Sequence, residues 1–466
     1  MNILVKNLGA IKQAELKLGK FTIICGANNT GKTYVTYALF GFLDFWYKTF
    51  NIPVDAKYVE ILLKQGFISI NTNDFTQNAQ KILNDACLEY SSKLAGVYSA
   101  QKKLFENSKF EILLEENDIK LKSEVFELKI RPGSSNTDIF ILRKEENSNE
   151  LIITLLLEGT NTKIPQFIIK QTIGDALKRI IFGNLLPNPF IASAERTGSA
   201  IFRKELDFAR SRLIKELSKT DKEIDPFKLL MKETSGYALP VEANVEFIRQ
   251  LESLSKSNSF IAENHKEILN DFSNIIGGEY QVNREDELYF IPKNTSRIKL
   301  KMGESSSAVR SMLDIGFYLR HVAQKGDLLM VDEPELNLHP ENQRKVARLF
   351  VGLIHLGINI FITTHSDYII KELNTMLMLN SSKPYILEIA KNEGYQKNEL
   401  LGMDEICVYI ADMANLKLDG NIRATKCQTL IKAEINQEQG IEAKSFDKTI
   451  DDMNRIQDAI FFGGEL

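Results

Sequence analysis

The order of hydrophobic and polar positions predicts an α/β protein. Residues 328–331 form a short, continuous apolar run and residues 358–363 a mostly apolar one, which are typical of buried strands in a parallel sheet. Between and after them, at 346–353 and 367–379, apolar positions recur every three or four residues, as on one face of a helix. Strands that alternate with helices predict a parallel sheet covered on both faces.

The first hundred residues add a hairpin, a buried strand and a long helix. Residues 3–18 alternate apolar and polar positions around a glycine, which favours a hairpin. Residues 21–25 form an apolar run that fits a buried strand, and residues 32–47 are apolar on nearly every side, as in a buried helix. The pattern of residues 51–108 is mixed and mostly helical.

A period of two replaces the helical period at residues 110–158, which predicts an antiparallel meander with strands at 138–143 and 151–157. Helical spacing returns at residues 199–276, where Pro226, Gly236 and Pro240 interrupt the pattern. We therefore expect a short helical bundle there and no long coiled coil. The three expected helices have their apolar faces at Phe202, Leu206, Ala209, Leu213 and Leu217; at Val241, Val245, Ile248 and Leu251; and at Ile261, Ile268, Phe272 and Ile275.

The pattern also suggests a four-part division of the chain. Residues 1–198 form a first lobe that includes the antiparallel β lobe, and residues 199–276 form the helical insertion. Residues 277–420 form a second lobe, with strands at 288–291 and 297–302 and a helix at 305–323. Residues 421–466 form a C-terminal helical segment, since 445–462 has the pattern of an amphipathic helix.

Composition and charge narrow the class of protein. Lys and Arg total 58 and Asp and Glu total 62, so the net charge of −4 disfavours a protein that coats nucleic acid through a broad basic surface. No apolar run approaches the length of a membrane span, and the first residues have the pattern of a strand and not of a signal peptide. The four cysteines are far apart and form no CxxC motif. A cytoplasmic protein without a disulfide framework is expected.

The strongest local motif is a P-loop, GxxxxGK[ST], between the strand at 21–25 and the helix that follows it. Glycine backbones permit successive N–H groups to surround phosphate oxygens at the start of a helix. Lys32 would place its ammonium group between the β- and γ-phosphates, and the Thr33 hydroxyl would bind Mg²⁺. The predicted ATP-binding residues of the loop are Gly26, Asn28, Asn29, Thr30, Gly31, Lys32 and Thr33.

Two adjacent acids follow the apolar run at 328–331. If this run is a central strand, Asp332 lies at its carboxyl end, where open α/β sheets bind ligands. Asp332 is then a candidate to hold Mg²⁺, and Glu333 to orient or deprotonate an attacking water. A strand that simply ends in solvated acids would have the same pattern.

Two further signals accompany the acids. His365 comes just after the apolar run at 358–363, so we expect it at the same edge of the sheet, within reach of a γ-phosphate. A serine-rich turn at 303–307 joins a strand to a helix. Its hydroxyls are either N-caps or phosphate ligands.

Along the chain the motifs follow the order P-loop, serine-rich turn, Asp-Glu and His, which resembles the ATPase head of ABC and SMC-type proteins. Within that group, residues 332–340 and 364–367 resemble the RecF-like and OLD-like AAA-family ATPases of bacterial anti-phage defence systems, of the Septu-, PARIS- or retron-associated type. Residues 194–198, with Glu195 and Arg196, resemble a short element of the same chains. The resemblance covers mainly residues 1–45, 190–200 and 297–380.

The resemblance implies a fold and a set of roles. The fold is an ABC/SMC-type P-loop head, with a mixed sheet, an antiparallel β lobe and a short helical insertion. Glu333, His365 and Lys32 would be catalytic, with His365 as the switch histidine, and residues 336–340 would be the D-loop. The turn at 303–307 would be the signature that contacts the γ-phosphate bound to a second subunit, through Ser305, Ser306 or Ser307. The usual glycine pair after the serine is absent, so which serine makes the contact stays open, and Gln166 and Gln171 are only nominal candidates for the Q-loop glutamine.

The resemblance further implies ATP and Mg²⁺ as cofactors and a homodimer, or a higher homo-oligomer, that closes around ATP. Nothing after residue 380 has the pattern of the Toprim nuclease of OLD proteins, so a separate effector, a nuclease-like protein, is expected. One alternative is a DNA-engaged repair or recombination ATPase of the RecF/SMC type, which the charge balance does not favour. Another is a transporter ATPase subunit, which the roughly 270-residue insert between Lys32 and Gly303 disfavours.

Overall fold

The computed structural model describes residues 1–116, 118–119, 125–130, 138–156, 165–201, 236–283, 287–293, 295, 298–418, 423–436, 440–441 and 444–461. Contacts group the chain into two units. Unit 1 contains Met1–Leu4, Phe42–Ser92 and Phe110–Asn188, and unit 2 contains Val5–Gly41, Lys93–Lys109 and Pro189–Leu466. The four-part division expected from the sequence stays a prediction, because these two units are drawn along different boundaries. Three elements have residues in both units: β1 (Asn2–Leu8), α1 (Lys32–Lys48) and β5 (Lys109–Leu113).

Unit 1 contains a four-stranded antiparallel sheet in the order β4-β8-β7-β6. Alternate positions of its strands are buried, among them Ile70, Leu142 and Ile153, so one face of the sheet packs inward. The strands and helices of this unit are β4 (Phe67–Asn71), β6 (Phe126–Ile130), β7 (Phe140–Lys144), β8 (Glu150–Leu155), α2 (Ala56–Gln65), α3 (Asn73–Gln77), α4 (Ala79–Ser91), α6 (Gln166–Leu177) and the π-helical turn η2 (Lys178–Phe182).

The sheet of unit 1 confirms the predicted meander and adds one strand to it. Strand β4 lies within the segment that we expected to be mostly helical, and it pairs with β8 so that Ile68 lies opposite Ile153. Its five residues alternate between exposed and buried positions, too short a run to stand out between two helices. The turn expected near residues 131–136 lies outside the described residues.

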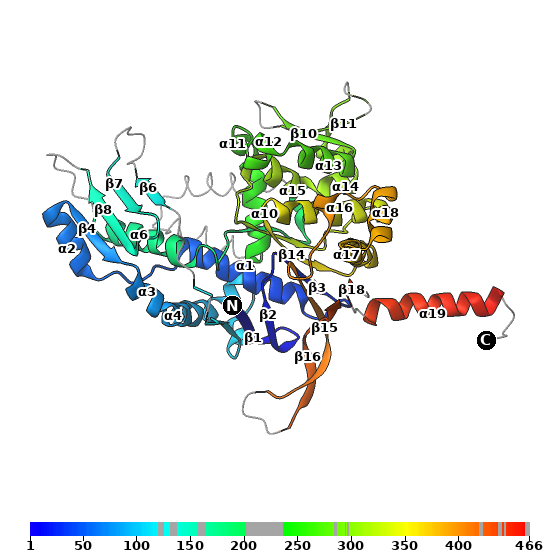
Figure 1. Cartoon of the computed structure of the whole chain (residues 1–466), viewed down its shortest axis with the longest axis horizontal. Coiled ribbons are helices and arrows are strands. Elements are labelled where there is room, and N and C mark those ends of the chain that lie inside the picture. The colour runs from blue at the N-terminus through cyan, green and yellow to red at the C-terminus, as the bar shows by residue number, and fades with distance from the viewer. Residues whose placement is uncertain are drawn as a thin grey trace, which may run out of the picture. The chain divides into compact units, whose positions relative to one another are not determined.

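Unit 2 is built on a six-stranded sheet in the order β16-β15-β3-β14-β13-β9. The five strands from β15 to β9 are parallel, and β16 pairs antiparallel with β15. Strands from opposite ends of the chain therefore lie side by side, as Figure 1 shows for blue β3 and orange β15. The strands are β3 (Phe21–Cys25), β9 (Pro189–Ala192), β13 (Leu328–Asp332), β14 (Asn359–Thr364), β15 (Ile406–Leu416) and β16 (Thr425–Lys432).

The register of this sheet brings three strand ends to one edge. Strand β14 lies between β3 and β13, with Thr364 opposite Cys25 and Thr363 opposite Asp332. The loops that follow β3, β13 and β14 therefore leave the sheet side by side at its carboxyl edge, the edge at which parallel sheets bind ligands.

The sheet is buried on both faces, as predicted. Ile23 and Ile362 face a core shared with α16 (Pro340–His355) and α17 (Asp367–Leu379), while Ile24 and Phe361, which alternate with them, are also fully buried. The other helices of unit 2 are α5 (Leu94–Val97), α7 (Arg196–Ile201), α10 (Leu239–Arg249), α11 (Leu251–Leu254), α12 (Phe260–Asn264), α13 (Lys266–Ile276), α14 (Ser307–Ser311), α15 (Leu313–Phe317), α18 (Pro384–Asn392) and α19 (Lys444–Phe461), with short turns η1 (Lys102–Phe105), η3 (Met302–Glu304), η4 (Tyr318–Val322) and η5 (Lys397–Glu399).

Two of the three helices expected at 199–276 are present as the series α10–α13. Ile248 and Phe272 belong to the core of unit 2, and the last helix ends at Gly277 with φ of 73°, the left-handed conformation that glycine adopts without strain. The expected first helix, with Phe202 to Leu217, lies outside the described residues. The predicted helix at 305–323 is divided into α14, α15 and the π-helical turn η4.

The segment expected to be a helical C-terminus contains strands as well. Residues Thr425–Lys432 form β16, whose pairing with β15 extends the main sheet, and α19 is the helix of this segment among its described residues. Alternation in β16 is imperfect, so its strand conformation depends on its partner. The remaining strands are β2 (Ile11–Lys17), which with β1 falls in the predicted hairpin segment, β10 (Gly278–Val282), β11 (Leu288–Pro292), β12 (Leu300–Lys301), β17 (Ile435–Asn436) and β18 (Gly440–Ile441). Among the described residues, none of the helices has the length and apolar character needed to cross a bilayer.

Candidate functional site

The P-loop follows β3 and ends where α1 begins, as its sequence predicts. Gly26 has φ of 142°, and a Cβ at this position would lie 2.7 Å from the carbonyl oxygen of Ala411. Gly31 has φ of 93°, and its Cβ would lie 2.8 Å from Ile11. Both positions therefore require glycine, for conformation and for space.

Lys32 is the buried cation of this loop. Its Nζ donates hydrogen bonds to the carbonyl oxygens of Gly26 and Ala27, each at 2.9 Å. Burial lowers the pKa of Lys32, while the charges of Glu333 and Asp332 act in the opposite direction. The ammonium group is thus already held inside the loop that would surround a phosphate.

Asp332 and Thr33 form the part of the site that fits a magnesium ion. Asp332 is almost fully buried, and its Oδ1 accepts a hydrogen bond from the Thr363 hydroxyl. Its Oδ2 is buried without a hydrogen-bond partner among the described residues. Burial raises the pKa of Asp332 to about 6, and the hydroxyls of Thr363 and Thr33 oppose this rise.

An unsatisfied carboxylate oxygen beside a threonine hydroxyl at the end of a P-loop suits Mg²⁺, which prefers oxygen ligands. Thr33 and Asp332 would hold the ion, which supplies positive charge for the phosphates when it is bound. Nowhere in the described part of the chain do three or more His, Cys, Asp or Glu side chains form a metal-binding group, so phosphate and water oxygens would complete the coordination.

Glu333 has a strained backbone that its neighbours hold in place. Its φ is +53°, in the left-handed region that side chains other than glycine rarely adopt. Its amide donates to the carbonyl oxygen of Thr363 (3.0 Å), and its own carbonyl oxygen accepts from Arg196 (2.9 Å). The left-handed turn directs the chain away from the strand immediately after Asp332, so that the two acids occupy different positions.

His365 lies between two carboxylates. Its Nδ1 is 3.7 Å from Oε1 of Glu333 and 3.3 Å from Oε1 of Glu335. Glu335 is nearly buried, and its Oε1 also accepts from the backbone amide of His365 (2.8 Å) and the hydroxyl of Thr364 (2.9 Å). The sequence placed His365 beside Glu333 correctly but gave Glu335 no role, although its position two residues after Glu333 was a usable signal.

Arg196 connects the strand ends of the site beneath its surface. It is fully buried and donates to four carbonyl oxygens, of Ser193 (2.8 Å), Ser311 (2.6 Å), Asp332 (2.6 Å) and Glu333 (2.9 Å). A guanidinium group has five donors in a rigid planar arrangement, which suits this task. The backbone of both acids is thus fixed to α14 and to the end of β9.

The buried charge of Arg196 is opposed by Asp314, which is itself buried and has no hydrogen-bond partner among the described residues. Burial raises the pKa of Asp314 to about 7, and Arg196 opposes the rise. Glu195, the neighbour of Arg196, is exposed and accepts a hydrogen bond from Tyr37 at 2.9 Å. Of these two neighbours, Glu195 therefore lies at the surface and Arg196 in the interior.

A cavity of about 550 Å³ collects most of the residues predicted for the site. Gly26 and Asp332, which border the loop and the strand end, are buried. The cavity is lined by Asn28, Asn29, Thr30, Gly31, Lys32, Thr33, Glu333 and His365, together with Ala10 and Tyr34, which sequence reasoning missed. The three candidate serines do not line it, and Gln166 and Gln171 belong to α6 in unit 1.

The three serines have different surroundings. Ser305 is buried, and its hydroxyl donates to the carbonyl oxygen of Lys301 (2.9 Å). Ser306 is exposed and caps α14, where its Oγ accepts from the amide of Val309 (3.3 Å). Ser307 is half-buried at the first position of the helix. N-capping, one of the two alternatives considered for this turn, is thus present at Ser306.

A strand, a phosphate-binding loop and a helix beside an acidic strand end define the class of P-loop nucleotide hydrolases. The comparison with protein families makes the assignment specific. Residues 1–370 match the model of the AAA ATPase domain, and the chain belongs to this family and is an ATPase.

No curated protein matches the chain. Solved structures that resemble it include three SMC heads. A head bound to the C-terminal winged-helix domain of ScpA is 11% identical, with 92% of this chain and 97% of that chain covered and a TM-score of 0.32. A head with an extended coiled coil, bound to the C-terminal domain of ScpA derived from Pyrococcus furiosus, is 13% identical, with 98% of each chain covered and a TM-score of 0.31. The SMC head domain from Thermotoga maritima is 9% identical, with coverages of 93% and 98% and a TM-score of 0.32. These scores are too low to decide anything about this chain.

Proposed function

We propose that this ATPase is an ABC/SMC-like switch that dimerises around ATP and controls a separate, nuclease-like effector in an anti-phage defence system. Each ATP is held by the P-loop of one subunit and by the serine turn of the other. Hydrolysis with Glu333 as the general base then releases the dimer. His365 would contact the γ-phosphate, and Mg²⁺ would be held by Thr33 and Asp332.

The observation that carries this proposal is the composition of the P-loop cavity. It contains Lys32, Glu333 and His365 but none of the serines, so a phosphate bound there meets the serine turn only if a second chain supplies it. Ser306 is exposed and Ser307 half-buried, which makes these two serines, and not the buried Ser305, the candidates for that contact.

Contacts within one chain support communication between its two half-sites. Arg196 donates to the carbonyl oxygens of Ser311 and of Glu333, and the Ser311 hydroxyl donates to the carbonyl oxygen of Leu336 at 3.0 Å. Helix α14, which begins at the serine turn, is thus hydrogen-bonded to the segment of the catalytic acid. A γ-phosphate that contacts the serines of one chain would therefore change the position of the hydrolytic residues of the same chain.

Subunit complementation tests the shared site. Lys32→Ala removes the P-loop ammonium, and Ser307→Arg places a bulky side chain at the serine turn, so each variant alone should be inactive. In an equal mixture, half of the dimers contain both chains and each of these has one intact site, so about a quarter of the wild-type ATPase rate should return. A mixture as inactive as its components would contradict the two-chain site.

A second experiment tests the ATP-dependence of the dimer. Glu333→Gln keeps the size of the side chain and removes the base, so it should accumulate as ATP-bound dimers in light scattering. Glu341→Gln, an exposed glutamate on α16, is the matched control and should hydrolyse ATP normally. If Glu333→Gln stays monomeric in saturating ATP, the dimer switch is wrong.

The partner is tested by co-purification from the native operon. We expect a nuclease-like protein that dissociates or becomes active when ATP is hydrolysed. Recovery of DNA instead, with affinity that falls steeply as salt rises, would favour a repair ATPase. A membrane permease would indicate a transporter subunit.

A further inference from the structure

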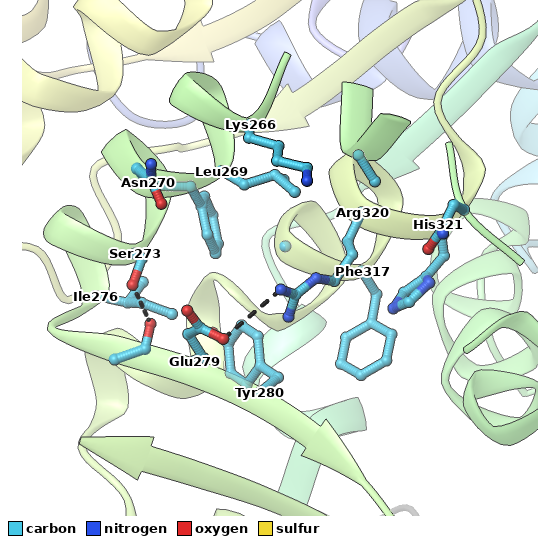
Figure 2. Close-up of a pocket in the computed structure, with 15 residues that line it drawn as sticks. Lys266, Leu269, Asn270, Ser273, Ile276, Glu279, Tyr280, Phe317, Arg320 and His321 are labelled. Carbon is cyan, nitrogen blue, oxygen red and sulfur yellow. Dashed lines mark hydrogen bonds and ion pairs between the residues drawn. The ribbon is translucent and has the colours of Figure 1, made fainter. Parts of the chain in front are cut away.

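A second cavity, of about 250 Å³, lies within unit 2 and shares no lining residue with the P-loop cavity. It is enclosed by α12, α13, β10 and the segment α15–η4. Figure 2 shows Lys266 and Leu269 on one side of it, with Tyr280 and Phe317 on the other and Arg320 between them. None of these residues has a role in the site described above.

The inner wall of this cavity is aromatic. The rings of Tyr280 and Phe317 have centroids 5.9 Å apart, and those of Phe272 and Tyr280 are 6.4 Å apart. Gly316 allows this packing, because a Cβ there would lie 2.7 Å from Phe272 and 2.8 Å from Tyr280. Such a wall offers planar apolar contact, the main requirement of a site for an aromatic ligand.

Two cations, Lys266 and Arg320, and one carboxylate, Glu279, line the cavity beside uncharged polar groups. Lys266 makes no hydrogen bond or ion pair with the described residues, and Arg320 has only a long pair with Glu279, at 3.6 Å, in which both side chains are partly exposed. A pair of this kind contributes little and is readily replaced by a ligand anion. His321 donates from Nδ1 to the carbonyl oxygen of Ser257. Burial lowers the pKa of His321, which favours the uncharged ring, so the positive charge of the cavity comes from Lys266 and Arg320.

The cavity is joined to the serine turn by a short path. Arg320 and His321 belong to the π-helical turn η4, a rare conformation that occurs often at functional sites. This turn continues the series of helices that starts at Ser307, and the Tyr280 hydroxyl donates to the carbonyl oxygen of Val309 in α14. A ligand that orders Tyr280 and η4 would also order α14.

From these contacts we infer that this cavity binds a small aromatic anion, a planar ring with one carboxylate or phosphate group, and that binding regulates the ATPase. The ring packs on Phe272, Tyr280 and Phe317, and the anionic group pairs with Arg320 and Lys266. Binding rests on the cavity alone, whereas its effect on turnover rests on the proposed function of the serine turn.

The test uses 2-naphthoate and phenyl phosphate as probes of the full-length protein without nucleotide, followed by saturation-transfer NMR and calorimetry. At least one probe should bind with one-to-one stoichiometry, and neutral 2-naphthamide at least about ten-fold more weakly than 2-naphthoate. Arg320→Ala should weaken anion binding about ten-fold or more, and Leu269→Trp, which fills the cavity, should abolish it. Lys325→Ala, an exposed lysine after η4, is the matched control and should bind as the wild type does.

Thermal melts identify variants that fail to fold, and Lys266→Ala then replaces Arg320→Ala as the test of the cationic group. Absence of binding by both probes, or equal affinities in the wild type, Arg320→Ala and Leu269→Trp, would overturn the inference. Binding that follows this pattern but leaves the ATPase rate unchanged would overturn only the regulatory part. Failure of subunit complementation with intact probe binding would instead count against the proposed function.

Discussion

Oε1 of Glu335 lies 3.3 Å from Nδ1 of His365 and accepts a hydrogen bond from the backbone amide of the same histidine. One carboxylate therefore holds both the backbone and the ring of His365. Since Glu333 lies 3.7 Å from the same ring nitrogen, Glu335 also holds the histidine near the acid that we propose as the general base. Under the proposed function, Glu335 is a positioning residue, which would act on the reaction through His365.

Glu335→Gln should lower kcat about ten-fold and leave the KM for ATP within about two-fold, because it disturbs orientation and not the P-loop. The double variant Glu335→Gln/His365→Ala should be no slower than His365→Ala alone, since both changes affect one unit. Steady-state ATPase kinetics provide the measurement. If the rate losses of the two single variants multiply in the double variant, the two residues act independently, and the positioning role is contradicted.

Lys32→Ala should reduce the ATPase rate at least about a hundred-fold and weaken nucleotide binding, because the loop loses the one ammonium group that lies within it. The lysine also bonds two loop carbonyl oxygens, so the loop itself should loosen. Fluorescent-nucleotide titration and single-turnover hydrolysis separate the two losses. Lys20→Ala, an exposed lysine paired with Glu405, is the matched control and should change neither.

Arg196→Lys should destabilise unit 2 by about 3 kcal/mol, because a lysine has no planar set of donors for four carbonyl oxygens. Where the protein still folds, kcat should fall more than nucleotide affinity does, since the released carbonyl oxygens belong to Asp332 and Glu333. Urea denaturation and nucleotide titration test the two effects. Arg249→Lys, whose side chain pairs with Glu246 on α10, is the control and should behave as the wild type does.

Asp314 should make the stability of the protein depend on pH. Burial raises the pKa of its carboxyl group from the ordinary value of 3.8 to about 7 in the folded protein, because burial disfavours the charged form. Between these two pKa values the unfolded state binds fewer protons than the folded state, so the free energy of unfolding falls as the pH rises. The fall amounts to about 4 kcal/mol in all and is complete above pH 7.

Asp314→Asn removes this titration, so the free energy of unfolding of the wild type relative to the variant should fall between pH 5 and pH 8. Urea denaturation at several pH values measures this difference while other titrating groups cancel. Parallel stability curves for the two proteins would show that Asp314 does not titrate in this range.

Local sequence was sufficient for the elements that carry the P-loop chemistry. The Gly26–Lys32 loop, the acids after β13 and His365 after β14 are short motifs attached to buried strands, and both signals are local. Parallel strands end at a common edge, so the sequence also predicted that these residues meet. Strands β4, β9, β15 and β16 were among those missed, because short or imperfectly alternating segments become strands only through their partners.

By itself, the sequence determined the class of fold, the nucleotide loop and the acids that would serve it, because each depends on residues close together in the chain. Only the tertiary structure decided that Arg196, more than a hundred positions from Asp332, fixes the backbone of both acids and that Glu335 holds His365. Every residue type has a backbone carbonyl oxygen that can accept a hydrogen bond, so the sequence does not reveal which residues accept one. Such contacts, and the aromatic cavity behind the serine turn, depend on where distant segments pack and not on any local pattern.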